Sequence, residues 1–136
     1  MQAEHLARLL GVPGLGAKLG DVERCLEDSL DNPTALAAAS RRVTDAGGKR
    51  LRPALTIACA GLGAVYDERV VASAAAAELV QVGSLVHDDL LDGALTRRGT
   101  PTINAPGLLT EVSFNSALAA VAAFTASAED LASAAR

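Results

Sequence analysis

The sequence is poor in aromatic residues and has no tryptophan: only Tyr66, Phe114 and Phe124 carry aromatic rings. The chain therefore lacks the stacking surfaces that bind single-stranded nucleic acid and the packing units of an aromatic-rich β-sandwich core. It also lacks a basic excess, since 12 Lys and Arg stand against 16 Asp and Glu, for a net charge of −4. Proteins that bind the nucleic-acid backbone normally carry a basic excess. We therefore expect no nucleic-acid partner.

Cysteines are equally scarce, because Cys25 and Cys59 are the only two and stand outside any metal-binding spacing. Two cysteines are too few for a disulfide scaffold, so we expect two small buried side chains in a reducing compartment. The first ten residues include Glu4 and lack the cationic run of a secretory leader, so the expected localisation is cytoplasmic. Residues 112–128 carry no charge but contain polar side chains and are short for a bilayer span. We expect no stable membrane insertion.

Half of the residues are hydrophobic and about a fifth are alanine, the best helix former. The spacing of the apolar residues predicts helices at 19–30, at 34–44, from Pro53 to the glycines at 61–63, at 68–91 and from 112 onward. Thr34 and Asp67 are expected N-caps. The helix at 68–91 is apolar nearly all round, which predicts a central position. No run alternates with period two, and residues 93–110 have the composition of a loop, so the sequence predicts a single all-α domain over residues 1–136.

Three carboxylates end the predicted central helix. Asp88 and Asp92 would lie about 40° apart around the helix and Asp89 about 60° from Asp92, so all three could converge on one point. The carboxylates repel one another, and they also lie at the negative end of the helix dipole, which disfavours anions. A hard divalent cation such as magnesium would offset both unfavourable interactions. Gln81 lies close to two turns before Asp88 on the same stripe, with Ser84 between them. The alternative is a solvated acidic helix end.

Cationic residues gather in two segments that flank this helix. Arg97 and Arg98 follow it in the loop, and the segment GGKRLRP at residues 47–53 forms a glycine turn before a helix start. Glycine lets backbone amides approach a phosphate, and Lys and Arg donate to phosphate oxygens. Either segment alone fits an ordinary loop. With the carboxylates, they predict a site for a polyphosphate ligand chelated through magnesium.

Three segments resemble the opening motifs of the trans-isoprenyl diphosphate synthases, also called the polyprenyl synthetase family. They are GGKRLRP at 47–53, ELVQVGSLVHDDLLD at 78–92 and LTRRGTPTIN at 95–104, in the order and spacing of the family. The resemblance implies a partial helical bundle like the first half of the isoprenoid synthase fold. It also implies a prenyltransferase of isoprenoid biosynthesis. In that reaction an allylic prenyl diphosphate ionises to a carbocation, the double bond of isopentenyl diphosphate attacks it, and a proton is lost.

By this resemblance, Asp88, Asp89 and Asp92 form the first aspartate-rich motif. In the family, this motif takes part in catalysis by binding the allylic diphosphate through Mg2+. Arg97 and Arg98 correspond to the arginine pair that reaches the substrate diphosphates. Magnesium and the arginines would stabilise the negative charge that develops on the leaving group.

Five further residues take their roles from the resemblance. Lys49, Arg52 and Gln81 occupy the positions that hold isopentenyl diphosphate. Ser84 and Gly83 stand four and five positions before the first aspartate, where the family places a floor beneath the growing hydrocarbon tail. Both are small in this sequence. The resemblance therefore implies that elongation beyond a fifteen-carbon product is not blocked at these two positions.

The resemblance weakens toward both ends of the chain. Family members are about twice this length or more, beyond the single core that a chain of this size encloses. The only later acids, Glu111, Glu129 and Asp130, have the wrong spacing for the second aspartate-rich motif of the family. The sequence therefore looks like the amino-terminal half of a prenyl synthase. We expect it to need the missing half or a partner chain, as a homo- or hetero-oligomer.

Other interpretations remain open from the sequence. The chain could be a non-catalytic or regulatory subunit of a prenyl synthase hetero-oligomer. It could be a fragment of a class I terpene cyclase, although a cyclase has no need of a cationic segment for isopentenyl diphosphate. A phosphohydrolase built on His87 and Asp88 would need more histidine ligands than His5 alone provides.

Overall fold

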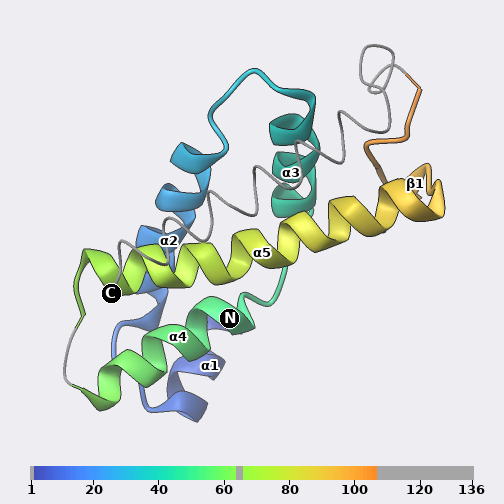
Figure 1. Cartoon of the computed structure of the whole chain (residues 1–136). Coiled ribbons are helices and arrows are strands. Elements are labelled where there is room, and N and C mark those ends of the chain that lie inside the picture. Colours follow the sequence, from blue (N-terminus) through green and yellow to red (C-terminus); the bar gives the residue numbers. More distant parts are fainter. Residues whose placement is uncertain (1, 64–65, 107–136) are drawn as a thin grey trace.

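The computed structural model describes residues 2–63 and 66–106 (Figure 1). These residues form five helices and one short hairpin. The helices are α1 (Gln2–Leu10), α2 (Leu15–Ser29), α3 (Ala35–Asp45), α4 (Leu51–Leu62) and α5 (Glu68–Asp92). The hairpin pairs β1 (Thr96–Arg97) with β2 (Thr100–Pro101) in antiparallel register. The predicted all-α class is confirmed, with this hairpin as a small addition.

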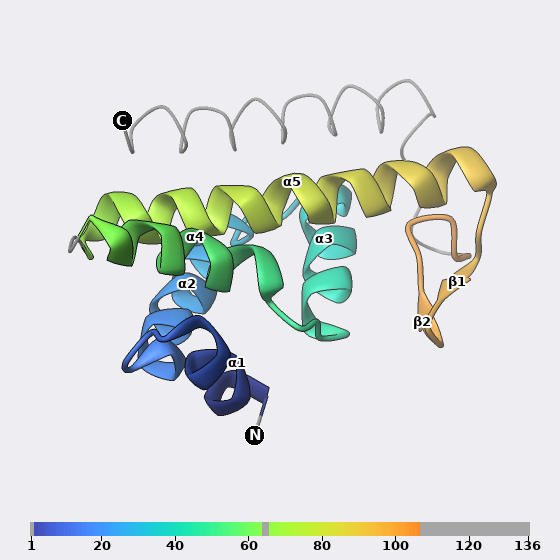
Figure 2. The same ribbon diagram turned by 90° about the horizontal axis from the view of Figure 1, so that it is seen from below.

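Helix α5 lies at the centre of the fold and contacts α2, α3 and α4. Helix α4 runs alongside α5 in both views, whereas α2 and α3 cross it (Figures 1 and 2). Among the described helices, α5 is the one long and apolar enough to cross a bilayer, with 44% of its most apolar window buried. Core helices share this composition because they are covered on several sides. The predicted central position is confirmed.

Two apolar clusters hold the helices together. The larger joins α2 to α4 and α5 through Leu15, Leu19, Val22, Leu26, Ile57 and Leu79. The smaller joins α3 and the segment after β2 to the carboxyl-terminal part of α5 through Leu36, Ala39, Val86, Leu90 and Ile103. Burial of each large aliphatic side chain contributes about 2 kcal/mol. The second cluster matters for function because it fixes the hairpin beside the acidic end of α5.

The residues at the ends of α3 and α5 have the capping roles that the sequence predicts. Thr34 Oγ1 accepts a hydrogen bond from the Ala37 amide at 3.1 Å, and the Asp67 carboxylate accepts from the amides of Arg69 and Val70 at 3.0 and 3.2 Å. Both predicted N-caps are confirmed. Gly93 ends α5 with a φ of 61°, a left-handed conformation that glycine adopts without steric cost.

Several elements differ from the expectation. Helix α1 was not expected, and α2 begins at Leu15 rather than at residue 19 because burial of Leu15 outweighs the low helix propensity of the nearby glycines. The hairpin lies within the expected loop. Cys59 is exposed and Cys25 is partly buried, so the expectation of two buried cysteines is wrong. The helix expected from residue 112 lies outside the described residues.

Candidate functional site

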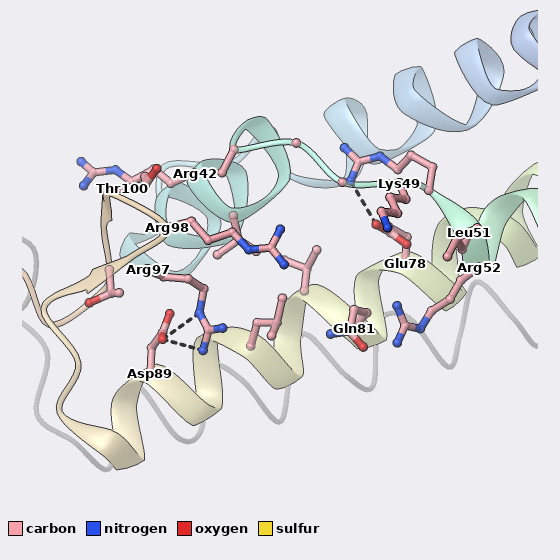
Figure 3. Close-up of a pocket in the computed structure, with 18 of the residues that line it drawn as sticks. Arg42, Lys49, Leu51, Arg52, Glu78, Gln81, Asp89, Arg97, Arg98 and Thr100 are labelled. Carbon is pink, nitrogen blue, oxygen red and sulfur yellow. Dashed lines mark hydrogen bonds and ion pairs between the residues drawn. The ribbon is translucent and has the colours of Figure 1, made fainter. Parts of the chain in front are cut away.

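A pocket of about 400 Å³ lies between the α3–α4 turn, one side of α5 and the β1–β2 hairpin (Figure 3). It is lined by cationic side chains from two loops far apart in sequence, together with polar groups of α5. Six of the residues singled out from the sequence are among its lining: Lys49, Arg52, Gln81, Asp89, Arg97 and Arg98. The structure therefore brings both cationic segments to one cavity.

The α3–α4 turn supplies the first cationic group. Gly47 has a φ of 80°, which a residue with a side chain rarely adopts. A Cβ at Gly48 would stand 3.3 Å from Arg50 Nη1, so a side chain there would crowd the guanidinium. Lys49 and Arg52 are exposed along this turn and border the cavity. The two glycines therefore let the chain turn tightly at the rim of the pocket.

Arg50 behaves differently from the basic residues beside it. Its guanidinium makes ion pairs with Glu23 of α2, at 2.5 Å, and Glu78 of α5, at 3.0 Å, and its side chain is only 14% exposed. Burial alone would lower the pKa of Arg50, but the two carboxylates raise it above its usual value. Arg50 thus supplies no free cation to the pocket, although it belongs to the same motif.

The hairpin supplies the second cationic group. Arg98 and Gly99 both have positive φ, at 52° and 80°, and form the tight turn between β1 and β2. The side chain of Asn104 donates to the backbone carbonyls of Asp89 and Ala94, and the Thr102 hydroxyl also donates to Ala94. These contacts hold the hairpin against the end of α5.

Asp89 and Arg97 form an ion pair at the wall of the pocket. Arg97 Nε donates a hydrogen bond to Asp89 Oδ1 at 2.9 Å, and Arg97 Nη2 lies 2.8 Å from the same oxygen, as the dashed lines in Figure 3 mark. The Asp89 side chain is 3% exposed. Hydrogen bonding to Asp89 raises the pKa of Arg97, and the charges of Asp88 and Asp92 add to the rise. The middle carboxylate of the motif is therefore already neutralised by a cation of the chain.

Asp88 and Asp92 are exposed, one turn apart, and do not line the pocket. Within residues 2–63 and 66–106, no three Asp, Glu, His or Cys side chains stand together where one metal ion could be held. The expected convergence of three carboxylates is not found, because Asp89 is buried and paired with Arg97 of the hairpin, whereas Asp88 and Asp92 are exposed. The oxygen donors of Asp88 and Asp92 nevertheless fit the chemistry that Mg2+ prefers.

Gly83 and Ser84 also lie outside the pocket lining. Gly83 is buried in α5, whereas Ser84 is exposed and its hydroxyl donates to the Gln81 carbonyl at 2.8 Å. The two positions proposed for control of chain length are therefore unlike in their surroundings.

The sequence reasoning missed five polar residues that line the pocket: Arg42, Arg50, Glu78, Thr100 and Thr102. Arg50 stands in the quoted motif, but its pairing with Glu23 joins residues 27 positions apart and cannot be inferred from spacing. Glu78 lies one turn before Gln81 on α5, and this spacing could have indicated that they share a face.

Residues 33–135 match the family model of the polyprenyl synthetases. The chain belongs to the polyprenyl synthetase family. The match includes every lining residue of the pocket. The resemblance noted from the three motifs is confirmed.

Curated relatives are synthases of isoprenoid chains of several lengths. The heptaprenyl diphosphate synthase component 2 of Geobacillus stearothermophilus is 41% identical over 92 residues, which are 67% of this chain and 29% of that protein. The geranylgeranyl diphosphate synthase of Methanosarcina mazei is 44% identical over 72 residues, which are 53% of this chain and 22% of that protein. The chain thus spans less than a third of these relatives.

Two solved structures share the arrangement of the helices. A decaprenyl diphosphate synthase from Rhodobacter capsulatus has a TM-score of 0.74 and 28% identity, over 96% of this chain and 38% of that one. An isoprenoid synthase family member from Thermotoga neapolitana has a TM-score of 0.70 and 31% identity, over 88% of this chain and 46% of that one. The fold described above is therefore that of part of an isoprenoid synthase.

Proposed function

We propose that this chain forms the first part of a prenyl diphosphate synthase active site. Its pocket would bind the diphosphate groups of isopentenyl diphosphate and an allylic prenyl diphosphate. One observation carries the proposal: besides Arg50, four cationic side chains from two distant segments line a single cavity, with the Gln81 amide on its helical wall. They are Lys49, Arg52, Arg97 and Arg98. Such a concentration of donors in one cavity suits a ligand with several phosphate oxygens.

The residues divide by position. Lys49, Arg52 and Gln81 lie on the α3–α4 side of the pocket and would hold isopentenyl diphosphate. Arg97 and Arg98 lie on the hairpin side and would stabilise the charge that develops on the departing diphosphate of the allylic substrate. These assignments follow the family motifs residue by residue, and the shared cavity supports them.

Mg2+ is the proposed metal cofactor. Asp88 and Asp92 would hold it, because they are exposed carboxylates at the end of α5. Mg2+ held there would supply positive charge to a bound diphosphate and Lewis-acid chemistry toward the leaving group. Asp89 would contribute less directly, since its carboxylate is engaged by Arg97.

The complete reaction would need further protein, in the same chain or in a partner. This chain covers 38% and 46% of the two solved structures above. The name of one relative, heptaprenyl diphosphate synthase component 2, supports a second chain as the source of the remainder. We place the assembled enzyme in the cytoplasm, as a homo- or hetero-oligomer.

Transfer of labelled isopentenyl diphosphate to an allylic diphosphate tests the proposal. The chain would be assayed alone and then with candidate partner chains, in the presence of Mg2+. We expect extractable prenyl product in at least one mixture and a loss of product when Lys49 and Arg52 are both replaced by Ala. A complex that assembles and makes no product would support the non-catalytic subunit instead. Product from the allylic substrate alone would indicate a cyclase.

A further inference from the structure

We propose that Arg50 is a positioning residue, which fixes the α3–α4 turn so that its neighbours Lys49 and Arg52 reach the pocket. The inference rests on the proposed function, in which those neighbours bind a substrate diphosphate. It assigns a distinct task to the middle cation of the GGKRLRP segment, one that involves no contact with substrate.

The contacts of Arg50 tie the turn to three helices. Nε and Nη2 donate to the two carboxylate oxygens of Glu23 in α2, at 2.5 and 3.2 Å. Nη1 donates to Glu78 in α5 at 3.0 Å, and Nη2 also donates to the Thr44 carbonyl near the end of α3 at 3.1 Å. A planar guanidinium can meet all these acceptors at once, whereas an ammonium on a flexible stem cannot.

The backbone of Arg50 adopts a conformation that needs this support. Its φ of 47° and ψ of 37° lie in the left-handed region, which costs a residue with a side chain free energy that its surroundings must offset. The same residue is the N-cap of α4, but its side chain makes no capping hydrogen bond. The ion pairs with Glu23 and Glu78, together with the hydrogen bond to the Thr44 carbonyl, hold it in place.

The cationic neighbours of Arg50 in this segment differ from it in exposure. Lys49 and Arg52 are exposed at the pocket, whereas the guanidinium of Arg50 is paired with Glu78 and Glu23. A conformational change at Arg50 would alter the direction of the chain between these two cations. The geometry therefore couples their placement to a carboxylate outside the cavity, because Glu23 does not line it.

Glu23 offers a test, because the loss of its charge and the loss of its support for the turn would change the affinity for an anion in opposite directions. Replacing Glu23 by Gln removes a negative charge near an anion site, so Coulomb attraction alone would strengthen binding of an anion. If Glu23 acts through Arg50, the same change loosens the turn and weakens binding. Glu27→Gln is a matched control, because it removes an equal charge from an exposed position one turn further along α2.

The experiment measures two properties of each variant. Calorimetry gives the affinity for inorganic pyrophosphate with Mg2+ present, and hydrogen exchange gives the protection of the amides at residues 47–52. We expect Glu23→Gln and Arg50→Lys to weaken pyrophosphate binding roughly tenfold, as loss of a supporting partner commonly does, and to speed exchange in the turn. Arg50→Lys keeps the positive charge, so a loss of pyrophosphate affinity in this variant would not be electrostatic. Glu27→Gln should change neither property.

Unchanged or stronger pyrophosphate binding by Glu23→Gln would overturn the inference, as would weaker binding without faster exchange in the turn. In a background that lacks both Lys49 and Arg52 side chains, Arg50→Lys should have no further effect on affinity; an additive loss would also overturn it. Absence of pyrophosphate binding by the unmodified chain would instead contradict the proposed function. The exchange measurement would then still decide whether Arg50 fixes the turn.

Discussion

Arg97 forms an ion pair with a single carboxylate oxygen of Asp89, to which its Nε donates a hydrogen bond, and this pair joins the hairpin to the acidic end of α5. The pairing separates Asp89 from the other acids of its motif. The Asp89 side chain is 3% exposed, whereas that of Asp88 is 59% exposed. Three aspartates that look alike in sequence therefore differ in what they can bind.

Asp89→Asn should destabilise the fold more than Asp88→Asn. The substitution at Asp89 leaves Arg97 without its carboxylate partner, and we expect the free energy of unfolding to fall by about 1–2 kcal/mol. Asp88 is exposed, so its substitution should cost less than about 0.5 kcal/mol. Urea unfolding followed by circular dichroism measures both. Equal effects of the two substitutions would show that the ion pair with Arg97 contributes no stability.

Ligand binding should depend on magnesium through the exposed acids. Unpaired carboxylates repel a diphosphate, and the same carboxylates hold it once a metal bridges them. We expect Asp88→Ala to abolish the metal dependence of binding of an allylic diphosphate, measured by calorimetry with Mg2+ and with a chelator. Glu68→Ala, which removes an equal charge from an exposed position at the other end of the same helix, is the control. Equal binding by the unmodified chain under both conditions would contradict the assignment of a metal site.

The parts of this structure that depend on local sequence could be predicted. Caps at Thr34 and Asp67 and the glycine end of α5 at Gly93 each depend on a few neighbouring residues. The two cationic segments could also be identified, because basic residues beside a glycine turn form a local pattern that suits a phosphate. Short strands of two residues each could not be found by alternation, since alternation needs a longer run.

The parts that depend on long-range pairing could not be predicted. A helical projection shows where Asp89 lies on α5 but not that the hairpin returns Arg97 to it. Likewise, nothing in the spacing of GGKRLRP indicates that Arg50 pairs with Glu23 while its neighbours stay free at the pocket. The sequence therefore identifies the cations of the site, and the fold decides which of them a ligand can reach.

The purified chain should associate with itself. Helix α4 exposes Leu51, Leu55 and Leu62, and α5 exposes Val80 and Leu91. Apolar faces of this kind favour burial against another surface. We expect sedimentation to show dimers or larger species at roughly tens of micromolar, a usual range for such association.

Leu55→Glu should reduce this association, because it places a charge in the apolar stripe of α4. Ala17→Glu, at an exposed position of α2, is the matched control and should leave the sedimentation unchanged. A compact monomer of the unmodified chain over the same concentrations would count against the prediction.

The only tyrosine of the chain should titrate at unusually high pH. Burial raises the pKa of Tyr66, and its hydrogen bond to Asp21, at 2.8 Å, raises it further. The folded chain then holds this proton more tightly than the unfolded chain. The resulting stabilisation is complete below the ordinary tyrosine pKa of about 10 and is lost as the pH rises through the higher folded value.

Ultraviolet absorbance of tyrosinate measures this titration directly, because the sequence has no other tyrosine and no tryptophan. We expect a higher midpoint in buffer than in concentrated denaturant, and a smaller difference for Asp21→Asn. Identical midpoints in buffer and denaturant would mean that the Tyr66 hydroxyl is not bonded to Asp21 in solution.

The last prediction concerns the length of the prenyl product in a reconstituted enzyme. Gly83→Phe or Ser84→Phe should shorten the product, because an aromatic ring would occupy volume that the growing tail needs, and packed interiors do not yield such space cheaply. Ser84→Phe is the cleaner test, since Ser84 is exposed on α5 whereas Gly83 is buried and its substitution also risks the packing of the helix. Leu95→Phe, at an exposed position after α5, is the control. If both α5 variants make products of the same length as the parent enzyme, other helices form the floor that limits the tail.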